Sequence, residues 1–204
     1  MGEIKSSTET LKEYVRKKHN SYLDKFTEGD VAFLAEYCID RNQSNTSELF
    51  KKNDIDSTYT DYFKRSETLE IREEIQYIHA RFLSKKNSVG PNAFGNRFLN
   101  FMNWWVDWMN DNGEHECYYC NVNENTARAA FEKGIISSKK TSFSGELQIE
   151  RLEPNKGYNS DNCRFACVLC NNAKSDMIYY KDFKDLIAPG ITRYWEKIKK
   201  DSNI

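Results

Sequence analysis

The sequence predicts an α+β protein, in which a mainly α-helical N-terminal region precedes a β-hairpin and a short helix. Three observations lead to this class. Apolar side chains recur at helical spacing over much of residues 8–111. The run 147–152 (LQIERL) instead alternates apolar and polar residues, as a half-buried strand does. Two Cys-x-x-Cys pairs, at 117–120 and 167–170, bracket that run.

Composition is that of a globular chain, with 39% hydrophobic, 14% aromatic and 30% charged residues. No apolar run approaches the roughly 18 residues of a membrane span, and residues 1–7 lack the apolar segment of a secretory signal. We therefore expect a cytoplasmic protein with no membrane partner, whose six cysteines are reduced and available to a metal. Its net charge of −1 implies that any nucleic acid meets a local basic face.

Three regions are expected along the chain: a helical part at 1–111, the hairpin module at 112–180 and a helical extension at 181–204. Segment 97–109 is rich in Phe and Trp, and such rings can stack on the bases of a single strand. Their spacing favours a buried stripe instead, with Trp104 lying off it. The helical part would then recognise the target, a partner protein or a second copy of the chain.

The predicted hairpin consists of the run 147–152, a turn and a second short run at 163–166. Pro154 and Gly157 supply the turn, because proline fixes φ and glycine tolerates positive φ. A helix-compatible segment, 171–177, follows the second Cys-x-x-Cys pair. The local order is therefore strand, strand, helix.

The four paired cysteines predict a structural zinc site. Zn²⁺ takes four tetrahedral ligands, and one Cys-x-x-Cys knuckle presents two thiolates to the same ion. Asn121 follows the first pair, where a knuckle needs a residue that tolerates the left-handed conformation. Because all four positions are filled, this zinc cannot activate water. Cys38 and Cys163 fall outside the spacing and are expected to be ordinary buried thiols. The predicted zinc ligands are Cys117, Cys120, Cys167 and Cys170.

This arrangement resembles the HNH, or ββα-metal, nuclease superfamily. It is most similar to a zinc-braced branch with an acid-Arg-apolar-acid-Pro run, then Gly-Tyr, Asp-Asn and Cys-x-x-Cys-Asn-x-x-Lys. In this sequence the matching segments are 150–154 (ERLEP), 157–158 (GY), 161–162 (DN) and 167–174 (CVLCNNAK). The match spans residues 117–177, about a third of the chain. The resemblance implies a ββα-metal fold with a treble-clef-like zinc.

The resemblance also implies a second, catalytic metal, Mg²⁺ or Mn²⁺, held by Glu150 and Asn171. Carboxylate and amide oxygens suit these ions, and Asn171 can point across at the strand because successive helical residues rotate by about 100°. Asn162 would brace the hairpin loop. Lys174, one turn further on, would meet a phosphate or an acidic neighbour. Without the surrounding motif, Glu150 reads as an exposed strand carboxylate and Asn171 as an ordinary helix cap.

Two further sets of residues complete the predicted site. Arg151 stands where the family usually has the histidine that serves as general base, and a guanidinium cannot accept a proton. It can clamp the scissile phosphate or stabilise charge in the transition state, or it pairs only with a nearby carboxylate. Lys139 and Lys140, in a basic loop before the hairpin, are expected to contact nucleic acid.

The base itself has two candidates. His115 lies two residues before Cys117, so the knuckle fixes it near the module, and its ordinary pKa near 6.5 suits a base at neutral pH. The alternative is that His115 only caps or packs the knuckle. Tyr158, in the hairpin loop, is the second candidate.

The function that follows is a divalent-metal-dependent endonuclease that hydrolyses phosphodiester bonds, with DNA favoured over RNA. Restriction, homing and anti-phage defence all use this module. The competing interpretation is a zinc-braced module on the same fold that binds nucleic acid or protein and has lost catalysis.

Overall fold

The computed structural model describes residues 5–20, 27–35, 38–39, 66–89, 92–137, 145–202 and 204. They fall into two compact units, Met1–Asp107 with Tyr158–Ser160, and Trp108–Gly157 with Asp161–Ile204. The division after Asp107 lies close to the predicted turn, and residues 181–204 belong to the second unit. Among the described helices, none is both long and apolar enough to cross a membrane.

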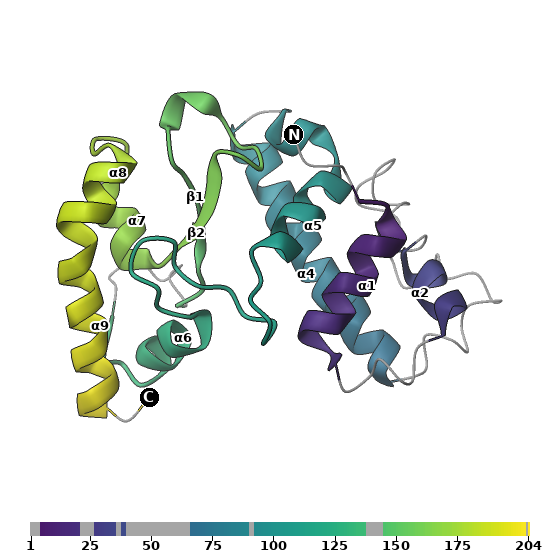
Figure 1. Ribbon diagram of the computed structural model, residues 1–204, viewed down its shortest axis with the longest axis horizontal. Coiled ribbons are helices and arrows are strands. Elements are labelled where there is room, and N and C mark those ends of the chain that lie inside the picture. Colours follow the sequence, from purple (N-terminus) through teal and green to yellow (C-terminus); the bar gives the residue numbers. More distant parts are fainter. Residues whose placement is uncertain are drawn as a thin grey trace. The chain divides into compact units, whose positions relative to one another are not determined.

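The first unit is helical where it is described. Its elements are α1 (Ser7–Lys18), α2 (Glu28–Ala35), α4 (Ser66–Val89), the 3-10 helix η5 (Ala93–Asn96) and α5 (Phe98–Asp107) (Figure 1). Helix α1 begins at a capping box, in which the Ser6 hydroxyl accepts from the Glu9 amide and the Glu9 carboxylate accepts from the Ser6 amide. These bonds satisfy amides that the first helical turn leaves without helical partners.

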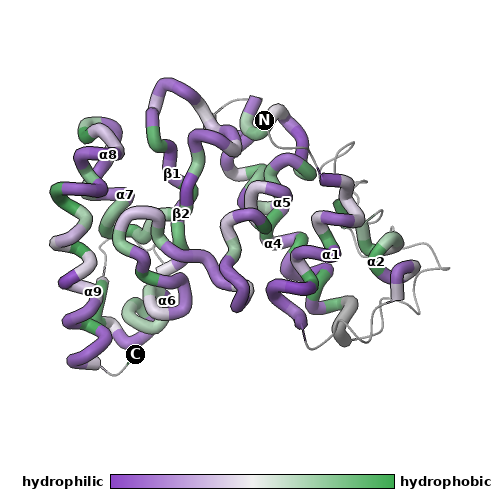
Figure 2. Tube along the Cα trace, in the orientation of Figure 1, coloured by the Kyte–Doolittle hydropathy of each residue, from purple (hydrophilic) through white to green (hydrophobic). Residues whose placement is uncertain are grey.

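The core of this unit is aromatic. Of the predicted stripe, Phe98, Phe101 and Trp105 are buried, whereas Trp108 is only half-buried. Trp104, which the spacing places off the stripe, is buried as well, with 2% of its surface exposed. Its ring lies 5.3 Å from that of Phe94 and 5.5 Å from that of Phe101. Figure 2 shows apolar residues interleaved with polar ones along these helices, as expected where one face is buried. The four rings of α5 therefore form core, and they are not exposed for stacking on bases.

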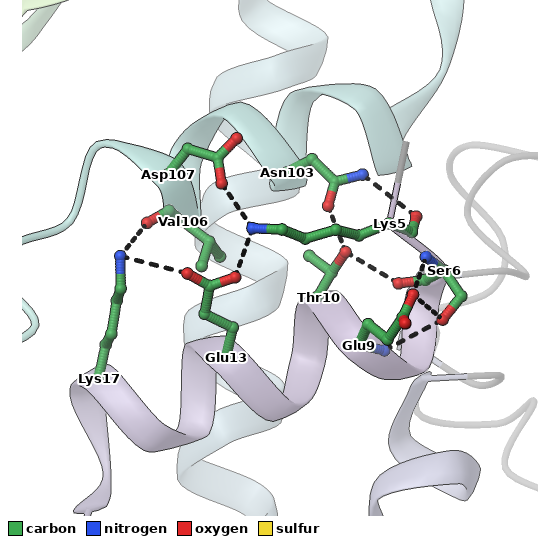
Figure 3. Close-up of polar contacts among 9 residues, drawn as sticks. All are labelled: Lys5, Ser6, Glu9, Thr10, Glu13, Lys17, Asn103, Val106 and Asp107. Atoms are coloured by element: carbon green, nitrogen blue, oxygen red, sulfur yellow. Dashed lines mark hydrogen bonds and ion pairs between the residues drawn. The ribbon is translucent and has the colours of Figure 1, made fainter. Parts of the chain in front are cut away.

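Polar contacts join α1 to α5 inside the first unit (Figure 3). The Lys5 ammonium lies 2.5 Å from a Glu13 carboxylate oxygen and 2.7 Å from Asp107 Oδ1. The Lys17 ammonium donates to the Val106 carbonyl at 3.0 Å, which satisfies a carbonyl in the last turn of α5. Because the ion pairs are partly exposed, each contributes at most about 1 kcal/mol to stability.

His79 on α4 makes the stability of this unit sensitive to acid. Its side chain is buried against the Phe98 ring, with 4.8 Å between centroids, and burial, together with the charge of Lys86, lowers its pKa to about 4. An unfolded histidine has a pKa near 6.5, so below that pH the unfolded chain binds a proton that the folded chain does not. Stability should therefore fall as pH drops from about 6.5 to about 4.

Thermal unfolding of the wild type and of His79→Leu at pH 7 and pH 5 tests this expectation. The variant should lose less stability than the wild type between the two pH values. An identical loss in both proteins would contradict it.

The second unit contains the β-hairpin. Its elements are α6 (Glu124–Glu132), β1 (Gln148–Arg151), the 3-10 helix η6 (Pro154–Lys156), β2 (Cys163–Ala166), α7 (Val168–Lys174), α8 (Tyr180–Asp182), the π-helical turn η7 (Phe183–Ile187) and α9 (Ala188–Ser202) (Figure 1). Strands β1 and β2 pair antiparallel, and α7 follows β2 directly. The protein is therefore α+β with a ββα module, the class that the sequence predicts.

The hairpin register decides which side chains share a face. Ile149 pairs with Phe165, and Glu150 pairs with Arg164. Cross-strand partners point to the same side of a sheet, and neighbours along a strand point to opposite sides. One face of the hairpin thus carries Ile149 and Phe165, and the other carries Glu150 and Arg164. Helix α7 lies against the second face, because its Lys174 contacts Glu150.

Candidate active site and metal centre

The four paired cysteines meet at one point. The sulfur atoms of Cys117, Cys120, Cys167 and Cys170 all lie within 4.8 Å of one another, and all four side chains are buried. Cys120 Sγ and Cys167 Sγ are 3.7 Å apart. Four sulfurs at the usual zinc distance of about 2.3 Å form a tetrahedron with edges of about 3.8 Å. The donor set and its spacing therefore fit a closed zinc site.

Local backbone geometry builds the two knuckles. In the first, the Asn121 amide donates to the Cys117 carbonyl at 2.9 Å, and Asn121 adopts the expected left-handed conformation with φ of 57°. In the second, the Cys167 sulfur accepts from the Cys170 amide and caps the N-terminus of α7. The Tyr118 amide donates to the Phe165 carbonyl at 2.8 Å and joins the first knuckle to β2. A metal here would fasten α7 to the hairpin.

Glu150 is buried inside a polar cluster on the α7 face of the hairpin. Only 5% of its surface is exposed; Oε1 lies 2.5 Å from the Lys174 ammonium, and Oε2 accepts from the Tyr119 hydroxyl at 2.8 Å. Burial raises the pKa of Glu150, although the hydrogen bonds from Lys174 and Tyr119 oppose that shift. Burial and the nearby Glu150 charge also raise the pKa of Tyr119. Glu150 is thus a buried, paired carboxylate, and not the exposed strand carboxylate of the alternative interpretation.

Lys174 is completely buried and surrounded by oxygen atoms. Besides Glu150, its ammonium donates to the carbonyls of Arg151 and Ser175, each at 3.2 Å. An ammonium has three N–H donors, so these three acceptors satisfy it. Of the two roles predicted for Lys174, the structure supports the pairing with an acidic neighbour. The predicted contact between Lys174 and nucleic acid stays a prediction, and in this conformation the ammonium is buried.

Asn171 lies one helical turn before Lys174 and faces the same strand. Its amide nitrogen donates to Gln148 Oε1 at 2.5 Å. Gln148 and Glu150 are two residues apart and share one face of β1. Asn171 and Lys174 are three residues apart and share one face of α7. The contacts Asn171–Gln148 and Lys174–Glu150 therefore belong to the same interface between strand and helix. Carboxylate and amide oxygens of this kind suit Mg²⁺ or Mn²⁺, and the ammonium shows that a cation fits beside Glu150.

Asn162 braces the hairpin loop, in the role predicted for it. Its amide nitrogen donates to the carbonyls of Glu153 at 2.9 Å and Gly157 at 2.7 Å, while its oxygen accepts from the Glu153 amide at 2.9 Å. The side chain is buried, with 4% exposed. It therefore satisfies three backbone groups across the loop that connects β1 to β2.

Asn162→Ala should lower the free energy of unfolding by about 1–3 kcal/mol, because it leaves those buried backbone groups without partners. Denaturant unfolding measures this loss. Asn172→Ala, which removes the same side chain from an exposed position on α7, should change stability little. Equal stability of the two variants would argue against the brace.

Arg151 and His115 occupy other surroundings. The Arg151 guanidinium donates to the Pro154 carbonyl at 2.9 Å and lies 3.7 Å from Asp176 Oδ1, with 23% of the side chain exposed. His115 is buried, and its ring centroid lies 4.0 Å from that of Phe165. Since Phe165 is on the opposite hairpin face from Glu150, His115 does not join the cluster. The ring therefore packs on β2, and the role of His115 as general base stays a prediction.

Three predicted residues remain: Tyr158, Lys139 and Lys140. Tyr158 belongs to the first unit, where its carbonyl accepts from the Phe94 amide and the Lys85 ammonium lies 5.2 Å from its ring centroid. Lys139 and Lys140 fall outside the described residues.

Sequence reasoning missed Tyr119 and Gln148. The alternation of side chains along β1 places Gln148 on the same face as Glu150, so the sequence pattern is sufficient to predict that Gln148 belongs to the site. Nothing in the spacing of the knuckle indicates that Tyr119 reaches Glu150.

Comparisons with known proteins add one likeness. No family model matches the chain, and a search of curated proteins finds no match. Among solved structures, the chain is similar to the rare-cutting HNH restriction endonuclease PacI, with 21% identity and a TM-score of 0.45 over 59% of this chain and 78% of that one. The residues described above define a ββα module with a buried four-cysteine centre beside a buried Glu–Lys pair.

Proposed function

We propose that the chain is a zinc-braced endonuclease of the HNH type that hydrolyses phosphodiester bonds in DNA with the help of a divalent metal. The observation that carries the proposal is the buried polar cluster between β1 and α7, in which Glu150, Lys174 and Tyr119 meet. Burying charged groups is costly and is not needed to hold a module that already has four metal ligands. Such clusters are typical of functional sites.

Each residue has a role in this proposal. The four cysteines hold a structural zinc, and Glu150 and Asn171 would hold Mg²⁺ or Mn²⁺, which polarises a phosphate and lowers the pKa of bound water. Tyr119 orients the Glu150 carboxylate by donating to Oε2. Arg151, whose side chain is 23% exposed, would bind the scissile phosphate through two N–H donors. Asn162 keeps the loop between the strands in shape.

The general base is not assigned to a histidine. The sequence has three, and His19 and His79 belong to the first unit, while His115 packs on Phe165. A divalent metal held by Glu150 and Asn171 would make a side-chain base unnecessary by lowering the pKa of its water, whose proton would pass to bulk solvent.

A specific observation favours a second candidate function. The Glu150 carboxylate is already neutralised by Lys174, as expected of a module that has kept the fold and lost the metal. Such a protein would bind nucleic acid, or a protein partner, without cutting. The helical first unit would supply recognition in either case.

Incubating the zinc-loaded protein with supercoiled plasmid and with single-stranded RNA separates these functions. The proposal expects plasmid nicking with Mg²⁺ or Mn²⁺ and none with EDTA. Retarded but uncut DNA under every metal would instead identify the binding module. Cleavage of the RNA but not of the plasmid would mean that the substrate is RNA and not DNA.

A further inference from the structure

The oxygen atoms around the Lys174 ammonium form a cation site. One carboxylate oxygen and two backbone carbonyls surround the nitrogen, all at 2.5 to 3.2 Å. Carboxylates and carbonyls are also the ligands that hard divalent cations prefer. The ammonium therefore occupies a position whose chemistry suits a metal ion.

The backbone is bent to build this position. Ser175 has φ of 49° and ψ of −153°, a conformation that non-glycine residues rarely adopt. In this conformation its amide still donates to the Asn171 carbonyl while its own carbonyl accepts from Lys174. The strained residue thus directs an oxygen at the cation.

A second carboxylate adds negative potential nearby. Asp176 follows Ser175, its side chain is 71% exposed, and its charge contributes to the raised pKa of Glu150. A dication would gain more from these two carboxylates than a single ammonium does, because the attraction scales with charge.

We propose that Lys174 is a built-in counter-ion that occupies the catalytic cation site, so that a divalent metal binds Glu150 only by displacing the Lys174 side chain. This inference rests on the proposed function, since it concerns the same metal. A metal ion that took all three of these oxygen atoms would stand at the position of the ammonium nitrogen, and two cations at such short range in a buried site repel each other strongly. Metal binding therefore moves the ammonium from the interior to water, and the metal-free cluster stays closed.

Amine labelling of the wild type tests the displacement directly. The zinc-loaded protein is treated with an acetylating reagent with and without Mn²⁺, and labelling is read by peptide mass spectrometry. Lys174, which has no exposed surface, should be protected without Mn²⁺ and labelled on the order of tenfold faster with it. Lys156, whose side chain is 62% exposed, should be labelled equally in both. A Lys174 that stays protected while Mn²⁺ is bound overturns the proposal.

Metal affinity gives a second readout. Lys174→Met keeps the length of the side chain and removes its charge, so Mn²⁺ measured by electron paramagnetic resonance should bind on the order of tenfold more tightly than to the wild type. Adding Glu150→Gln should remove this gain. Equal or weaker binding by Lys174→Met would mean that the lysine supports the metal, which contradicts displacement. If Lys174→Met does not fold, the wild-type labelling decides.

The two proposals fail in different ways. Displacement of Lys174 by Mn²⁺ without any cleavage would uphold the counter-ion and reject the nuclease. Cleavage with Lys174 protected throughout would uphold the nuclease and reject the counter-ion.

Discussion

A Cys170→Ser protein is expected to lose its zinc and the folded structure of the second unit. Structural zinc sites contribute on the order of 10 kcal/mol to folding, which is comparable to the whole stability of a small domain. Among the described residues of the second unit, the sheet consists of β1 and β2, and such a two-stranded hairpin is marginal alone. The four thiolates join the first knuckle to the N-terminal end of α7.

Zinc content by elemental analysis and unfolding by circular dichroism check this expectation. Cys163→Ser is the matched control, because Cys163 is buried on β2 but lies outside the four-sulfur cluster. It should keep one zinc per chain. A Cys170→Ser protein with wild-type stability would show that the fold does not depend on the metal.

Glu150→Ala is expected to abolish cleavage and to destabilise the second unit by about 3–5 kcal/mol, because it leaves the buried Lys174 ammonium without a counter-charge. If Glu150 were instead on a hydrated surface, its replacement would abolish cleavage without this loss of stability. Cleavage assays and denaturant unfolding on the same preparation separate the two contributions.

The double variant Glu150→Gln, Lys174→Met supplies the control for this pair. Replacing both members of a buried ion pair by neutral residues of similar volume is often nearly neutral in stability. It should therefore recover most of the stability lost in Glu150→Ala while staying inactive. A double variant as unstable as Glu150→Ala would argue against the ion pair as the cause.

The sequence predicts the four-cysteine cluster well because the spacing of the paired cysteines is encoded locally. Two residues between paired cysteines suffice to form a knuckle, and Asn121 marks the left-handed position within it. The hairpin follows in the same way from the alternation of 147–152 and from the turn residues. The bracing by Asn162 was expected only through the family resemblance.

It is harder to predict from the sequence which side chains are buried and which face of the hairpin each one meets. Lys174 carries a side chain long enough to reach from α7 to Glu150 on β1, and no local sequence pattern indicates that it is completely buried. His115 is close to the knuckle in sequence, yet the hairpin register places its partner Phe165 on the face away from Glu150. Trp104 lies off the helical stripe but is covered by Phe94, which comes from a different element.

One measurement tests the central claim most directly: the rate of plasmid nicking in Mg²⁺ or Mn²⁺ by zinc-loaded wild type and Glu150→Gln proteins of equal zinc content. The glutamine keeps the shape of the side chain and removes the charge that would hold a divalent metal. The wild type should nick the plasmid and Glu150→Gln should not. Cleavage at the wild-type rate by Glu150→Gln would show that the reaction takes place away from the Glu150–Lys174 cluster.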